Sequence, residues 1–135
     1  MSEVTKKRPE FRNIHITQLS NYRLPLAGLI SILHRVSGAL MFLLLPVILY
    51  FLDQSLISEG TFNYFRNVTS GWFAKLIVLA LAWAYLHHFF AGIRHLAMDS
   101  HFGLEKQSAR HTSVAVLVVS LSLTALVASK LFGVF

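Results

Sequence analysis

This chain of 135 residues contains no cysteine, few acids and few charged residues of any kind. Without cysteine it cannot hold an iron–sulfur cluster, a disulfide, a thiolate zinc site or a covalently attached c-type haem. Charged residues are 13% of the composition, about half of the roughly 25% that is typical of soluble domains. A compact soluble protein of this size exposes too much surface for so few charges. The composition therefore argues against a soluble enzyme and against a disordered chain.

The sequence is instead rich in apolar segments. Apolar residues make up 55% of the chain, and three apolar runs are each long enough to cross a bilayer, which takes about 20 helical residues. Because a backbone in lipid must satisfy its own hydrogen bonds, these runs should be helices. The sequence predicts an all-α membrane protein, with one membrane-anchor domain over residues 1–135 and a short amphipathic N-terminal segment. Three transmembrane helices are expected at about residues 26–52, 72–95 and 112–133, with a kink at Pro46.

The basic residues predict how the chain is oriented in the membrane. The 12 bases outnumber the 6 acids, and most of them lie in residues 1–27 and 94–111, whereas residues 53–71 hold only Arg66. Positively charged segments tend to stay in the cytoplasm, so the N-terminus and the 94–111 connection should face that side. The N-terminus lacks the pattern of a signal peptide. We expect a multi-pass protein of a bacterial inner membrane, with membrane lipid and not nucleic acid around its positive charges.

One group of polar residues lies near the start of the first helix. Ser31 and Arg35 are four residues apart and share a helix face, with His34 beside them. Helix length places Arg35 at or just inside the cytoplasmic face of the membrane. Two interpretations remain open: an arginine that reaches lipid phosphates, and a polar pocket for a quinone. A hydroxyl and a guanidinium can both donate to quinone carbonyl oxygens, and the permanent charge of Arg35 can stabilise negative charge on the reduced ring.

A second group lies near the end of the second helix. His88 precedes Arg94 by six residues, so it lies roughly 9 Å inside the membrane, where ionisable side chains are functional candidates. Neutral imidazole is a common axial ligand of haem iron, and Gly92 would leave room for a flat macrocycle. The alternative is a histidine that bonds to a neighbouring helix. His87 points about 100° away from His88, and its environment is open.

The charges near these residues suit the carboxylates of a haem. His34, Arg35 and Arg94 would form a basic rim at the depth of the propionate groups. A lone intramembrane histidine supplies one axial bond, so a six-coordinate haem would need a second ligand from a partner subunit.

Two motifs together resemble the cytochrome b large membrane-anchor subunit of succinate dehydrogenase, which is respiratory complex II. They are residues 31–38 (SILHRVSG) and residues 88–99 (HFFAGIRHLAMD), and Arg8-Pro9 agrees with them although the residues that follow it depart from the family pattern. The resemblance implies that Ser31 and Arg35 line a ubiquinone site. It also implies that His88 is an axial ligand of haem b iron and that His34 and Arg35 lie near the haem propionates.

The resemblance further implies a role in electron transfer within a larger enzyme. Succinate would be oxidised on a flavoprotein subunit, and electrons would pass through an iron–sulfur subunit to ubiquinone. A second membrane-anchor subunit would share the haem b, and this chain alone would hold no complete active site. The alternatives are an anchor of a fumarate reductase that uses menaquinol, a haem-free structural anchor, and a transport or channel subunit. The last is disfavoured because the charged groups gather at one membrane face instead of at several depths.

Overall fold

The computed structural model describes residue 17 and residues 23–134. Within them the chain forms four α-helices: α1 Leu26–Ile57, α2 Glu59–Ser70, α3 Trp72–Asp99 and α4 Lys106–Leu131. Helices α1, α3 and α4 are long and apolar enough to cross a membrane, and the described residues contain no strand. This confirms the all-α membrane fold. The expected amphipathic N-terminal segment and the Arg8-Pro9 pair lie outside the described residues.

Local sequence sets where α1 begins and where it gives way to α2. Pro25 precedes α1 in an extended conformation, and its carbonyl accepts hydrogen bonds from the amides of Gly28 and Leu29. Ser58 separates α1 from α2 and forms a capping box with Thr61, in which each side chain bonds to the other residue's backbone amide. Such a box satisfies two amides that the helix itself leaves unpaired.

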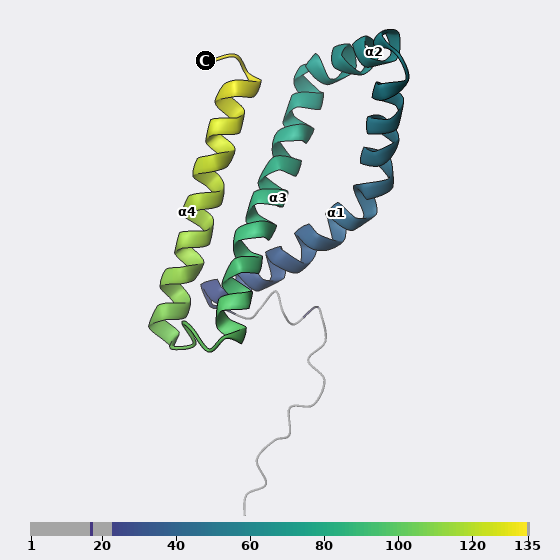
Figure 1. Ribbon diagram of the computed structural model, residues 1–135. Helices are drawn as coiled ribbons and strands as arrows, with labels where there is room; N and C mark the ends of the chain where they lie inside the picture. The colour runs from purple at the N-terminus through teal and green to yellow at the C-terminus, as the bar shows by residue number, and fades with distance from the viewer. Residues whose placement is uncertain (1–16, 18–22, 135) are drawn as a thin grey trace, which may run out of the picture.

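The connection between α3 and α4 turns on two residues with a left-handed backbone. His101 has φ 65° and Gly103 has φ 76°, a conformation that glycine adopts at no steric cost. Glu105 then precedes α4, where a negative charge favours the positive end of the helix dipole. The short connection makes α3 and α4 antiparallel neighbours (Figure 1).

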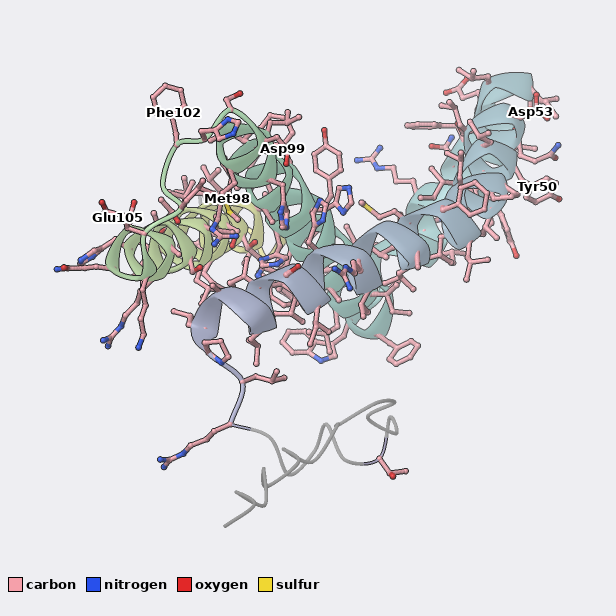
Figure 2. All side chains as sticks on the ribbon, turned by 90° about the horizontal axis from the view of Figure 1, so that it is seen from below. Tyr50, Asp53, Met98, Asp99, Phe102 and Glu105 are labelled. Atoms are coloured by element: carbon pink, nitrogen blue, oxygen red, sulfur yellow. The ribbon has the colours of Figure 1, made fainter. Side chains whose placement is uncertain are left out.

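Figure 2 shows Met98, Asp99, Phe102 and Glu105 around the α3–α4 connection. Tyr50 and Asp53 lie beside α2, away from that connection.

The helices extend beyond the apolar runs that predicted them. Helix α1 continues to Ile57 instead of ending near residue 52, and α4 begins at Lys106 instead of near residue 112. The connection at residues 53–71, expected to be a loop, is almost wholly helical. Hydropathy marks the part of a helix that lies in hydrocarbon, and a helix can continue into the more polar interface beyond it.

The packed core is small and lies at one end of the three long helices. Ile30, Ala91 and Val116, one from each helix, form its buried cluster. Ser120 of α4 is also fully buried, and small residues of this kind let transmembrane helices approach closely. Most large apolar side chains are exposed, including Phe42 at 74%. A surface of this kind suits lipid and would associate in water.

Helix α1 bends away from α3 beyond this core. Figure 1 shows its first half crossing α3 and its second half diverging from it. Pro46 lies within the helix, and a proline removes one backbone hydrogen bond and clashes with the preceding turn. The bend therefore has an identifiable cause in the sequence. The 32 residues of α1 span about 48 Å at about 1.5 Å per residue, which exceeds a hydrocarbon core of about 30 Å.

Candidate functional site

His88 lies on α3 with one ring nitrogen turned toward α1. Its Nδ1 is 3.0 Å from the backbone carbonyl oxygen of His34 and 3.3 Å from the hydroxyl oxygen of Ser37. A carbonyl can only accept, so this contact places the proton on Nδ1. Nε2 then carries the lone pair, and no described residue bonds to it. The ring is partly exposed, and one nitrogen fixed by a carbonyl with the other left free is the usual arrangement of a metal-binding histidine.

The ring of His34 covers one face of the His88 ring. Their centroids are 4.1 Å apart and their planes differ by 15°, and the His95 ring lies 5.0 Å from His34. A metal bound to Nε2 approaches along the ring edge, so the stacked face does not block it. With the two rings stacked, His34 would not hold the same iron as His88 from the other side of a macrocycle.

Gly38 of α1 packs directly against His88. A Cβ at position 38 would lie 2.8 Å from Cε1 of His88, closer than side chains approach one another. Gly92, which was expected to make room for a macrocycle beside His88, lies next to the His34 ring, where a Cβ would be 3.5 Å from Nε2. The role of Gly38 was missed from the sequence, although a glycine one turn after His34 was a visible sign of close helix packing.

Replacing Gly38 with alanine should force α1 and the His88 ring apart. Overpacking of this kind costs about 1–3 kcal/mol, so the variant complex should unfold at a lower temperature than wild type. Gly28→Ala is the matched control on the same helix, because its Cβ would meet Pro25 at an ordinary 3.7 Å. An unchanged melting temperature in Gly38→Ala would show that the helices do not approach as closely as described.

Ser31 and Arg35 lie on the side of α1 that faces away from the core. Ser31 is half-buried and Arg35 is exposed, and neither bonds to another residue within the described part of the chain. Both residues lie within one helical turn of His34, whose ring stacks on that of His88. Ser31 and Arg35 therefore lie on the part of α1 whose His34 contacts His88, and their own roles stay a prediction.

His87 faces the interior. The ring is 1% exposed, its centroid lies 5.5 Å from that of Trp83, and neither ring nitrogen forms a hydrogen bond with the described residues. The peptide of Ile30 lies close to the ring but outside hydrogen-bond geometry. The sequence left the environment of His87 open. In the structure its ring lies between α3 and α1. It cannot reach a ligand on the outer surface.

Arg94 joins α3 to α4. Its side chain is buried, and its Nε donates to the hydroxyl oxygen of Thr112 at 3.1 Å, while that hydroxyl donates to the carbonyl of Ser108 at 3.0 Å. Arg94 was expected to form a basic rim with His34 and Arg35. The structure instead buries Arg94 and joins its Nε to α4.

The chain also matches known proteins along most of its length. Residues 5–127 match the family described as succinate dehydrogenase/fumarate reductase transmembrane subunit. The chain belongs to this family. The match includes both motifs and almost the whole of the three long helices. The anchor subunit is therefore an integral membrane protein of an oxidoreductase complex, as the two motifs indicated.

Individual relatives agree with this family. The succinate dehydrogenase cytochrome b556 subunit of Coxiella burnetii is 38% identical over 104 residues, which cover 76% of this chain and 82% of the relative. The subunit of the same name from Paracoccus denitrificans is 34% identical over 108 residues, which cover 80% and 83%. The succinate dehydrogenase cytochrome b560 subunit of Reclinomonas americana is 32% identical over 104 residues, which cover 73% and 72%. The resemblance to the cytochrome b anchor of succinate dehydrogenase is confirmed.

Proposed function

We propose that this anchor subunit binds haem b through Nε2 of His88 and helps to form the ubiquinone-reduction site of succinate dehydrogenase. The observation that carries the proposal is the contact from Nδ1 of His88 to the His34 carbonyl, which fixes the ring and leaves Nε2 free. The described residues contain no group of three or more histidine or acidic side chains that could hold a bare metal ion. One histidine therefore suits iron whose other ligands come from a macrocycle. When bound, haem b supplies a one-electron carrier in the membrane.

Neither His34 nor His87 would supply a second ligand to the iron of a bound haem. His34 is too close to His88 to serve from the opposite side, and His87 is enclosed between α1 and α3. A second membrane-anchor subunit packed against this open surface would supply the ligand and share the haem. The cytochrome b names of the relatives support a haem in this position.

Arg35 and its neighbours have two tasks in the proposed site. His34 and Arg35 bind the haem propionates, because a cation and an imidazole donor suit carboxylate oxygens. The Ser31 hydroxyl donates to a carbonyl oxygen of ubiquinone and orients the ring. The Arg35 guanidinium donates to the same end of the substrate and stabilises the negative charge that develops there during reduction. Both side chains are free within the described part of the chain to take up these roles.

The arrangement of charges supports a cytoplasmic location for this site. Bases are concentrated before α1 and at the ends of α3 and α4 that meet at their connection, which supports a cytoplasmic N-terminus and a site on the cytoplasmic side of a bacterial inner membrane. Electrons would reach it from a flavoprotein through an iron–sulfur subunit, whose clusters this cysteine-free chain cannot hold. The relatives are named succinate dehydrogenase, which supports the direction of succinate oxidation over the alternative of a fumarate reductase that uses menaquinol.

A redox difference spectrum of the purified complex tests the proposal. Reduction should produce the absorption band of a b-type haem, and succinate should reduce ubiquinone in the same preparation. A complex that contains this subunit and reduces ubiquinone without such a band would support a haem-free structural anchor instead.

A further inference from the structure

Helix α2 is amphipathic, although its segment was expected to be a loop. At about 100° per residue, its apolar and threonine side chains fall within an arc of about 160°, and its charged, amide and serine side chains fall within an arc of about 100° on the opposite side. The first set is Thr61, Phe62, Tyr64, Phe65, Val68 and Thr69, and the second is Glu59, Asn63, Arg66, Asn67 and Ser70.

The apolar side of α2 is only partly used within the chain. No residue of α2 is buried, and Phe62, Tyr64 and Val68 are 50%, 65% and 53% exposed. Phe65 alone of the larger side chains packs inward, with its ring 5.3 Å from that of Phe51 at the end of α1. Three large side chains on one side of a 12-residue helix therefore lack cover from the described residues.

The ends of α2 fix its depth. Ser58 links it directly to α1 and Gly71 links it directly to α3, so both ends are tied to helices that span the membrane. Figure 1 shows α2 lying across the ends of α1 and α3, remote from the α3–α4 connection. The exposed rings of Tyr50 and Trp72 lie near these junctions, and such aromatic residues collect at membrane–water interfaces.

We propose that α2 lies flat in the membrane interface and inserts its apolar side into the phospholipid leaflet opposite the candidate quinone site. Its exposed side chains continue the lipid-facing surface of α1 and α3. Helices of this kind bury their apolar side about 5–10 Å into the boundary between headgroups and acyl chains. The polar side carries one acid and one base, so insertion depends on apolar contact and not on anionic lipid. The proposal does not depend on haem or quinone binding.

Spin labels on opposite sides of α2 test this placement. Val68→Cys places a label on the apolar side and Asn63→Cys places one on the polar side, in the purified complex reconstituted into vesicles of zwitterionic phospholipid. Because this chain has no cysteine, the labelled wild-type complex gives the background from the other subunits. At the insertion depth of about 5–10 Å, the Val68 label should collide with an aqueous nickel chelate about tenfold less often than the Asn63 label, and more often with oxygen.

Two outcomes would overturn the proposal. Equal nickel access at both positions would mean that α2 is immersed in water, and low access of both nickel and oxygen at Val68 would mean that another protein covers it. Phe62→Cys repeats the measurement on the apolar side if the Val68 variant does not assemble. Vesicles with added anionic phospholipid should give the same pattern, and insertion only in their presence would contradict the role assigned to apolar contact.

Discussion

Replacing His88 with alanine is expected to remove haem b from the purified complex. The variant loses Nε2 of His88, the free nitrogen of an imidazole ring whose Nδ1 donates to the His34 carbonyl. Loss of a residue that only hydrogen-bonds to a metal ligand lowers the affinity for the metal by about 10–100-fold. Loss of the ligand itself should therefore lower the ratio of haem to protein by at least about tenfold. The measurement is the b-type band in a reduced-minus-oxidised spectrum, normalised to the amount of assembled complex.

Two further variants separate ligation from a general effect of losing a histidine. His111→Ala removes an exposed histidine of α4, outside both motifs, and should leave the haem content unchanged. Ser37→Ala removes a hydroxyl 3.3 Å from Nδ1 while the His34 carbonyl remains, so the haem should stay bound with at most a shifted spectrum. Full haem content with an unaltered band in the His88 variant would show that the ligand is a different residue.

Replacing Arg35 with alanine is expected to lower the rate of ubiquinone reduction by about 100-fold, which is typical when one preorganised donor to developing charge is lost. Arg35 is exposed and without a bond in the described part of the chain, so its removal should disturb the fold little. Succinate oxidation measured with a soluble artificial dye should persist, because that reaction does not use the membrane site. The two rates measured on the same preparation give the effect directly.

Charge and geometry at position 35 can be separated by a second substitution. Arg35→Lys keeps the positive charge but loses the planar pair of donors, and should retain more activity than alanine with weaker binding of ubiquinone. Arg110→Ala on the exposed start of α4 is a control for a general loss of positive charge. An equal fall of both rates in Arg35→Ala would instead indicate a role in assembly of the complex.

Much of the architecture was predictable because membrane burial leaves a strong pattern in sequence. A helix in hydrocarbon needs about 20 apolar residues, so the three spans could be located by counting. Helix α2 was not predictable in the same way. Its apolar residues are separated by polar ones, and only the helical repeat shows that they share one side. Helix ends were also missed, since polar residues such as Lys106 continue α4 beyond the apolar run.

The sequence nominated the members of the candidate site, which stay a prediction, but it did not show their contacts. Spacing along α1 and α3 was enough to single out Ser31, Arg35 and His88, since residues three or four apart share a helix face. It could not show that Gly92 lies beside His34 while Gly38 packs against His88. Those contacts depend on how one helix is rotated and shifted against another, and each helix has several apolar sides that could serve for packing.

The sequence by itself determined that this chain crosses a membrane with three helices and carries two motifs of a succinate dehydrogenase anchor, because hydropathy and local spacing are properties of single segments. The tertiary structure decided which nitrogen of His88 is held by α1, that His87 faces inward, and that Arg94 bonds to Thr112 on α4. These outcomes depend on contacts between residues far apart in the chain, so no single segment contains the information that specifies them.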